Sequence, residues 1–200
     1  MLWKYNTSPL IKEYELHMEP VIVTVNKFDE ESAKEFRMKV AMAHNTGQKI
    51  IPVVIDSYGG QVYSLMSMIS TIKNSELPIA TIVQGKAMSC GAVLLSFGAE
   101  GMRFAGPNAT IMIHEVTGGS FGRTDDIKVD AKQIEKLNDK ILSMISTNIG
   151  RSSGYIKEVI HEKNHADWFL DAEEARIINL VNFVRVPELS LTVDVKYKFE

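Results

Sequence analysis

The sequence predicts an α/β fold with a mostly parallel sheet, because short apolar runs alternate with segments of helical periodicity along the chain. The runs are rich in β-branched residues, which is typical of buried strands. The segments between them repeat apolar residues about every three to four positions, as amphipathic helices do. Of the 200 residues, 45% are hydrophobic, so we expect one domain with a sizeable core.

The first strand and helix follow an irregular stretch, residues 1–20, which we interpret as an N-terminal arm or gating segment. Residues 21–25 (VIVTV) predict a buried strand, and residues 29–44 predict a helix. The apolar residues on one side of this helix are Ala33, Phe36, Val40 and Ala43. We expect the main domain to span residues 21–186 and a tail to occupy residues 187–200.

The second strand is predicted over residues 50–56, although Pro52 argues against a fully paired central position. A turn at Gly59 and Gly60 leads into a helix over residues 61–75. The apolar residues of this helix at helical spacing are Val62, Leu65, Ile69 and Ile72.

The third and fourth strands end beside residues that can carry chemistry. Residues 78–85 predict a strand, and a short helix of small and apolar residues follows over 89–97. Residues 109–114 predict the next strand, which ends at His114. Sites in parallel α/β sheets form outside the carboxyl ends of strands, so the glycine turn, Ser89 and His114 are placed where a site is expected.

A glycine-rich loop over residues 117–123 precedes a long amphipathic helix over 125–149. Asp125 and Asp126 complement the positive end of its dipole. The apolar stripe of this helix consists of Ile127, Ala131, Ile134, Leu137, Ile141 and Ile145. Two shorter helices and a strand in the segment LVNFV, residues 180–184, are expected to close the domain.

Composition argues against several classes of partner. The net charge is −3, so neither nucleic acid nor an anionic membrane is an expected partner. No apolar run reaches the ~20 residues of a membrane span, and we identify no signal peptide. Cys90 is the single cysteine, which excludes a disulfide within the chain and suits a reducing compartment. We therefore expect a cytoplasmic protein.

Ser89, His114 and the glycine pair together suit nucleophilic acyl transfer, which needs a hydroxyl, a base and oxyanion donors. Each has an ordinary explanation when taken alone. The serine is explained by close packing of helix on sheet, the histidine by a hydrogen-bonded place in the core, and Gly59-Gly60 by a plain turn. Their combination has to be supported by wider motifs.

Four such motifs occur in the order IDSYGGQV, GKAMSCGAVLL, RFAGPNATIMIHEVTGGSFG and DWFLDAEEA. In order and approximate spacing they resemble the ClpP family, the proteolytic subunits of the ATP-dependent Clp protease. The resemblance covers residues 21–184. It implies a ClpP/crotonase-like fold of repeated β-α units with a protruding handle helix.

The resemblance also implies a catalytic triad. Ser89 matches the nucleophile of the family, His114 the general base, and Asp167 the carboxylate that orients the base. The stretch between His114 and Asp167 is a few residues longer than usual, so Asp171 is kept as an alternative to Asp167.

By the same resemblance, the backbone amides of Gly60 and Cys90 would form the oxyanion hole. The substrate would lie as an extended strand along Gly59, Gln61 and Val62. No metal and no cofactor are expected, because ATP would be used only by a partner. The implied reaction is hydrolysis of peptide bonds in unfolded polypeptides.

The family resemblance implies a homo-oligomer of stacked heptameric rings that encloses the site, and a hexameric AAA+ unfoldase as partner. The chain has no P-loop motif of its own. Two departures from the family are Asp56, where asparagine is usual, and Tyr58, where proline is usual. Pro52 and Val54 occupy the strand on which the family carries docking tyrosines, which puts the usual unfoldase in doubt.

Two alternatives compete with the serine peptidase. His161, Glu162 and His165 spell HEKNH, an H-E-x-x-H motif typical of zinc peptidases, with Glu173 or Glu174 as a conceivable third ligand. The polar Lys163 and Asn164, and a helix that is expected to end here, favour a solvated helix end instead. The second alternative is a catalytically silent ring subunit, against which the intact serine, histidine and aspartate argue.

Overall fold

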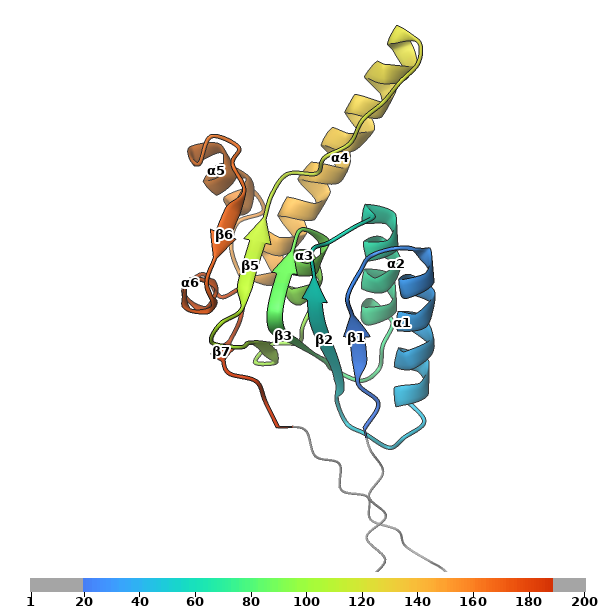
Figure 1. Ribbon diagram of the computed structural model, residues 1–200, viewed down its shortest axis with the longest axis vertical. Coiled ribbons are helices and arrows are strands. Elements are labelled where there is room, and N and C mark those ends of the chain that lie inside the picture. The colour runs from blue at the N-terminus through green and yellow to red at the C-terminus, as the bar shows by residue number, and fades with distance from the viewer. Residues whose placement is uncertain (1–19, 189–200) are drawn as a thin grey trace, which may run out of the picture.

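The structure is a computed structural model that describes residues 20–188 (Figure 1). The predicted arm at residues 1–20 and the predicted tail at 187–200 fall almost entirely outside the described residues. The described part is a mixed α/β domain with a seven-stranded sheet in the order β1-β2-β3-β4-β7, in which β5 pairs with both β3 and β6. All pairs are parallel except β5–β6. The predicted α/β class with a mostly parallel sheet is confirmed.

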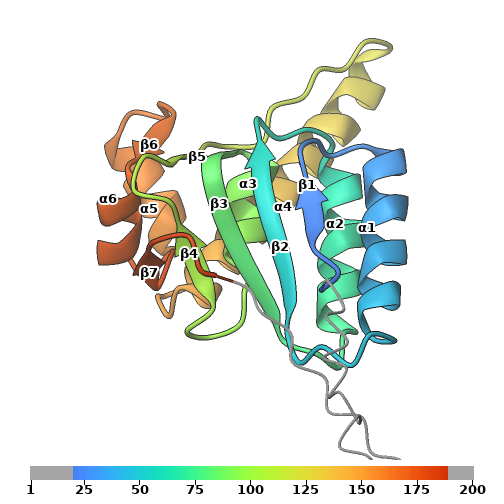
Figure 2. The same cartoon turned by 60° about the horizontal axis from the view of Figure 1, so that its bottom comes forward.

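The strands are β1 (Val23–Val25), β2 (Ile51–Ser57), β3 (Ile79–Met88), β4 (Arg103–Ala105), β5 (Thr110–Ile113), β6 (Trp168–Leu170) and β7 (Phe183–Val184). The helices are α1 (Glu30–Ala43), α2 (Val62–Lys73), α3 (Cys90–Leu95), α4 (Thr124–Asn148), α5 (Tyr155–Glu162) and α6 (Ala172–Ile177). Helices α1 to α4 gather behind the strands in Figure 2, so the sheet buries that face against them.

The predicted apolar face of α1 is buried: Ala33, Phe36, Val40 and Ala43 are each at most 5% exposed. In α2, Leu65 and Ile69 are buried as expected, whereas Val62 and Ile72 are half-buried at the margin of the core. Burial of these faces against the sheet supplies the main driving force for the α/β packing.

β2 is a central strand, with β1 on one side and β3 on the other, but Pro52 itself is not at a fully paired position, as the sequence indicated. The physical reason lies in the register. Pro52 is level with Ala80 of β3, but β1 begins to pair only at Val53, one residue further along. The proline therefore lies just ahead of the part of β2 that is paired on both sides.

β3 extends to Met88, three residues beyond the predicted end at Gly85. Its first half pairs with β4, at residues 81–83, and its last residues pair with β5, at residues 86–88. The register against β2 shifts at this change of partner, because Ile55 faces Val83 whereas Ser57 faces Ala87. Such an irregularity bends a strand and re-aims the residues after it. The bend brings the end of β3, and Ser89 after it, beside β5.

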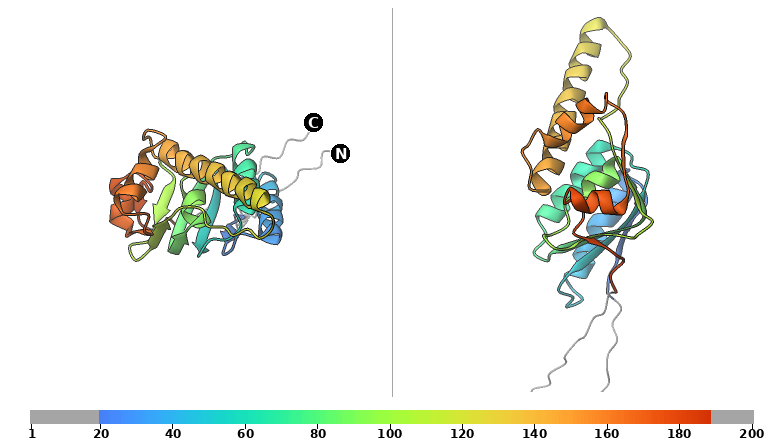
Figure 3. Two further views of the ribbon diagram at one scale, coloured as in Figure 1. Left: turned by 90° about the horizontal axis from the view of Figure 1, so that it is seen from above. Right: turned by 90° about the vertical axis from the view of Figure 1, so that its left-hand side faces the viewer.

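The long helix α4 projects beyond the sheet, as Figures 1 and 3 show. Its predicted stripe divides in two. Ile141 and Ile145 are buried in the domain, whereas Ile127 is 41% exposed and Ala131 is exposed as well. The N-terminal half of α4 and the loop before it therefore stand away from the domain, as a protruding handle does. Among residues 20–188, no helix is both long and apolar enough to cross a membrane.

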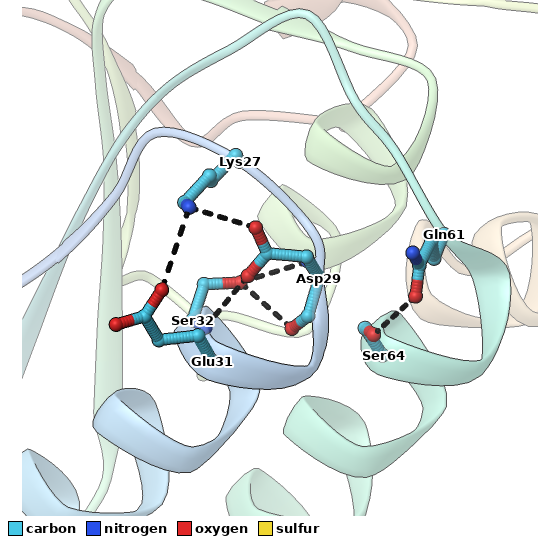
Figure 4. Close-up of polar contacts among 6 residues, drawn as sticks. All are labelled: Lys27, Asp29, Glu31, Ser32, Gln61 and Ser64. Carbon is cyan, nitrogen blue, oxygen red and sulfur yellow. Dashed lines mark hydrogen bonds and ion pairs between the residues drawn. The ribbon is translucent and has the colours of Figure 1, made fainter.

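The N-terminus of α1 is held by a capping box that also lies beside the glycine turn (Figure 4). Asp29 accepts a hydrogen bond from the Ser32 amide at 2.8 Å, and the Ser32 hydroxyl accepts one from the Asp29 amide at 2.9 Å. Lys27 pairs with the Asp29 carboxylate at 2.8 Å. This network holds the pKa of Asp29 at about 2, mainly because of the hydrogen bond from Lys27. These contacts of Lys27, Asp29 and Ser32 hold the backbone in place on either side of Phe28.

Candidate active site

Ser89 occupies a strained turn between β3 and α3. Its φ is 54° and its ψ is −120°, a region that residues with a side chain seldom adopt. The backbone is held on both sides of the turn. The Ser89 amide donates to the carbonyl of Met112 at 2.9 Å, and the Ser89 carbonyl accepts from the Ala92 amide at 3.0 Å. A strained strand-to-helix turn of this kind lifts a nucleophilic side chain out of the sheet.

The glycine turn approaches Ser89 so closely that a side chain at Gly59 has no room. A Cβ at Gly59 would lie 2.6 Å from the Cβ of Ser89 and 3.1 Å from its Oγ. Gly59 also has a φ of 109° and Gly60 a φ of 149°, which glycine adopts without steric cost. The Gly60–Phe28 bridge and the hydrogen bond from the Gln61 amide to the Phe28 carbonyl, at 2.7 Å, attach the turn to the start of α1.

Cys90 is the first residue of α3 and a buried neighbour of this turn. Its thiol donates a hydrogen bond to the Gly60 carbonyl at 3.3 Å. Burial raises the pKa of the Cys90 thiol, so the side chain stays protonated at neutral pH and is a poor nucleophile. Its backbone amide lies in the first turn of α3, where helical amides have no intrahelical acceptor.

His114 follows β5 directly and lines the same pocket as Ser89. Other residues of this pocket are Gly60, Val62, Cys90 and Glu115. The structure therefore brings together the predicted serine, histidine and oxyanion residues, which are far apart in the sequence. Of the predicted substrate-contacting residues, Gly59 abuts Ser89, Val62 lines the pocket, and Gln61 caps α2 and accepts from the Ser64 hydroxyl at 3.3 Å (Figure 4).

Asp167 directly precedes β6, and His114 directly follows β5. The antiparallel ladder ends at the pair of Ile113 and Trp168, so His114 and Asp167 are the residues that follow and precede this last pair. Asp171 lies at the other end of β6, where it is the N-cap of α6 and accepts a hydrogen bond from the Glu174 amide at 2.8 Å. The two aspartates therefore have different neighbours.

Among residues 20–188 of the isolated chain, no hydrogen bond joins Ser89 to His114 or His114 to Asp167. Catalytic hydrogen bonds are often long in the absence of substrate and tighten when substrate binds. A hydroxyl, an imidazole and a carboxylate are the side chains that nucleophilic acyl transfer uses.

A second polar cluster, which we call the His-Glu cluster, lies beside this pocket and consists of Glu115, His161 and His165. One ligand atom from each residue lies within 4.8 Å of the other two. The Nδ1 of His165 lies 2.8 Å from a carboxylate oxygen of Glu115, and the rings of His161 and His165 are 4.3 Å apart between centroids. The hydrogen bond with His165 holds the pKa of Glu115 below its usual range.

The HEKNH motif does not form the regular helix of a zinc peptidase. Helix α5 ends at Glu162, as the polar Lys163 and Asn164 indicated, and His165 lies in a left-handed turn with a φ of 59°. The carboxylate beside both rings is that of Glu115. The sequence did not indicate it, because its contact with the histidines depends on the pairing of β5 with β6. Glu173 and Glu174 are engaged elsewhere, with Arg176 and the Asp171 amide.

The two departures beside the glycine turn, Asp56 and Tyr58, share one partner. The Lys86 ammonium pairs with the Asp56 carboxylate at 2.8 Å and lies 4.4 Å from the centre of the Tyr58 ring. The hydrogen bond from Lys86 lowers the pKa of Asp56, and the same contact raises the pKa of Lys86. Asp56, Tyr58 and Lys86 thus form one surface group at the irregularity between β2 and β3.

The comparison with protein families agrees with this geometry. The model of the Clp protease family, described as "Clp protease", matches residues 10–187. That match covers most of the chain and includes all of the predicted site. This chain therefore belongs to the Clp protease family.

Proposed function

We propose that the protein is a serine endopeptidase in which Ser89 attacks the scissile carbonyl, His114 takes its proton, and Asp167 orients the imidazole. The observation that carries the proposal is that Ser89 lies in a strained turn and lines the same pocket as His114. His114 then gives this proton from Ser89 to the leaving amine as the acyl-enzyme forms. In the second half of the reaction His114 takes a proton from the attacking water and returns it to Ser89 as the acyl group leaves. Family membership supports a peptidase of the Clp type.

The register of β5 and β6 supports Asp167 as the orienting carboxylate. If the antiparallel register continued by one residue beyond the pair of Ile113 and Trp168, Asp167 would lie opposite His114, where a carboxylate could accept from the imidazole Nδ1. Asp171 already accepts the amide of Glu174 as a helix cap. A carboxylate in the first role fixes the tautomer of the base and stabilises the imidazolium that forms.

The oxyanion would bind to the backbone amides of Gly60 and Cys90. The Gly59 amide is not free for this role, because it donates to the Ser57 hydroxyl at 3.1 Å. The Cys90 thiol stabilises the glycine turn through its hydrogen bond to the Gly60 carbonyl. An extended substrate running along Gly59, Gln61 and Val62 would place its carbonyl between these amides and Ser89.

We further propose that the peptidase works in the cytoplasm as stacked heptameric rings that receive unfolded polypeptides from an ATP-driven AAA+ unfoldase. Clp protease membership supports an oligomeric assembly and an unfoldase in general. The projecting part of α4 and its loop add apolar side chains that the domain leaves exposed: Phe121 is 100%, Ile127 41% and Val129 67% exposed. We expect a second copy of the chain to cover these apolar side chains in an oligomer with closed symmetry.

Labelling with a serine-reactive probe tests the serine chemistry. A fluorophosphonate probe should label the protein, and peptide mapping should locate the adduct on Ser89; the Ser89→Ala variant should remain unlabelled. A labelled Ser89→Ala protein would contradict the assignment.

A second experiment tests the zinc peptidase alternative. If the protein is a serine peptidase, hydrolysis of a short peptide should persist in a strong chelator and in the His161→Ala variant. Loss of activity that zinc restores would favour the metallopeptidase instead.

A further inference from the structure

We propose that the His-Glu cluster of Glu115, His161 and His165 binds one divalent transition-metal ion, for which Zn²⁺ is the best match. Two imidazoles and one carboxylate are a ligand set that suits zinc, with water as a fourth ligand. This site goes beyond the proposed peptidase, since it uses neither Ser89 nor His114. It also departs from the expectation that the protein holds no metal.

The distances in the cluster fit a zinc ion after small movements. Tetrahedral zinc has bonds of about 2.0–2.1 Å, so its ligand atoms lie about 3.3 Å apart. The oxygen of Glu115 and the Nδ1 of His165, now 2.8 Å apart, would open by about 0.5 Å. The remaining ligand atoms lie within 4.8 Å, so they would close by about 1.5 Å at most. Both histidines are exposed and can make these movements without disturbing the core.

The backbone brings the two histidines together by a turn and not by helical periodicity. Asn164 and His165 have φ values of 56° and 59°, and the His165 amide donates to the Ile160 carbonyl at 3.0 Å. This turn folds the chain back over the end of α5, so that the ring of His165 faces the ring of His161. In an H-E-x-x-H zinc centre both histidines lie on one face of a helix, whereas here α5 ends at Glu162 and His165 lies in a left-handed turn, so the two sites differ in backbone geometry.

Glu115 is held in place from the opposite side by α4. Asn138 donates from Nδ2 to the Glu115 carboxylate at 3.2 Å and accepts from the Val116 amide at 3.0 Å. Carboxylate ligands of metals are commonly oriented by such outer hydrogen bonds. The site therefore has three potential ligands and a built support for one of them.

A metal in this cluster would tie together the two segments that carry the base and its carboxylate. Glu115 directly follows His114, and His165 precedes Asp167 by two positions. Without metal, these segments are joined here by the hydrogen bond between Glu115 and His165, which involves an exposed histidine. A metal would replace one hydrogen bond by three coordination bonds and should raise the melting temperature of the protein.

The test is a Zn²⁺ titration of the full-length chain, without an affinity tag, against a chromophoric chelator. We expect about one strong site per chain. The affinity should fall on the order of tenfold or more in Glu115→Gln, His161→Ala and His165→Ala. The matched controls are Glu162→Gln, the glutamate of the motif, and His44→Ala, the exposed C-cap residue of α1, whose Nδ1 contacts the Val40 carbonyl. Both controls should bind zinc as the parent does.

The titration is done in the Ser89→Ala background, so that its outcome does not depend on peptidase activity. Binding should be unchanged when His114→Ala is added, because His114 is not part of the cluster. Zinc should also raise the melting temperature of the parent and not that of His165→Ala. The proposal is overturned if the titration finds no strong zinc site, or if the three cluster variants bind zinc with the same affinity as the parent. It is also overturned if His114→Ala or Glu162→Gln loses zinc binding.

Discussion

His114 and Asp167 flank the last pair of the antiparallel β5–β6 ladder, because His114 follows Ile113 and Asp167 precedes its partner Trp168. This relationship depends on β6, a strand of three residues that pairs with β5 alone. It explains how a residue more than fifty positions away can act on His114, and it distinguishes Asp167 from its neighbour Asp171.

Replacing Asp167 by asparagine should lower kcat by about 10⁴-fold, because the imidazole of His114 would be held in the wrong tautomer. Asp171→Asn is the matched control. It should keep both kcat and stability, because asparagine caps a helix as well as aspartate does. Steady-state kinetics on a short peptide checks both. A normal kcat in Asp167→Asn together with a collapsed one in Asp171→Asn would move the assignment to Asp171.

Gly59→Ala should abolish peptidase activity and probe labelling of Ser89. Its new methyl group would lie 2.6 Å from the Cβ of Ser89, and its φ of 109° is strained for alanine. Gly119→Ala is the control, since a Cβ there meets nothing within 4 Å. Labelling rates and circular dichroism together show whether the site or the whole fold is lost. Normal labelling of Gly59→Ala would show that the turn does not pack against Ser89 as described.

Asp56→Asn, which restores the residue usual in the family, removes the ion pair with Lys86. We expect the effect of this change on the melting temperature to depend on pH. The folded pKa of Asp56 is lowered from 3.8, so its contribution to stability is present above that pH and is lost as the pH falls through the lowered value. The melting temperature of the variant should therefore lie below that of the parent at neutral pH, and the gap should narrow in acid. A gap that widens as the pH falls would contradict the ion pair. Any effect should be modest and reduced by salt, because both side chains are partly exposed.

Much of the fold could be predicted from the sequence, because the apolar faces of α1 and α2 and the runs of β1 to β3 follow simple periodicities. β4 and β6 were missed because each has three residues, too few to show a period, and neither lies in a longer β-branched run such as VIVTV around β1. The end of β3 was misplaced at Gly85, because the glycine marks the irregularity at which β3 changes partners and not a strand end.

For the site, Ser89 and His114 were recognised through family motifs, since neither residue stands out by itself. The His-Glu cluster was visible only in part. The HEKNH motif indicated both histidines, but the cluster also depends on a left-handed turn at His165 and on Glu115, which follows β5. Contacts of this kind arise from tertiary packing, which sequence spacing does not encode.

Val129→Asp should break the proposed assembly of rings through α4. Val129 is 67% exposed in the isolated chain, and a charge buried there against another subunit would be costly. Native mass measurement should show a large oligomer for the parent and a smaller species for the variant. Lys49→Asp introduces the same side chain on a surface away from α4 and should leave the mass unchanged. A parent protein that is a monomer of 22.4 kDa and digests folded proteins unaided would refute the chamber.

The most direct test of the central claim is the kcat/KM of Ser89→Ala on a short unstructured peptide, compared with that of Cys90→Ala. Our account predicts a loss of at least about 10⁴-fold for Ser89→Ala, because the nucleophile is gone and only binding and oxyanion contacts remain. Cys90→Ala should keep most of its activity, since only the backbone amide at that position is needed. Substantial activity in Ser89→Ala, or its loss in Cys90→Ala with the fold intact, would contradict catalysis by Ser89.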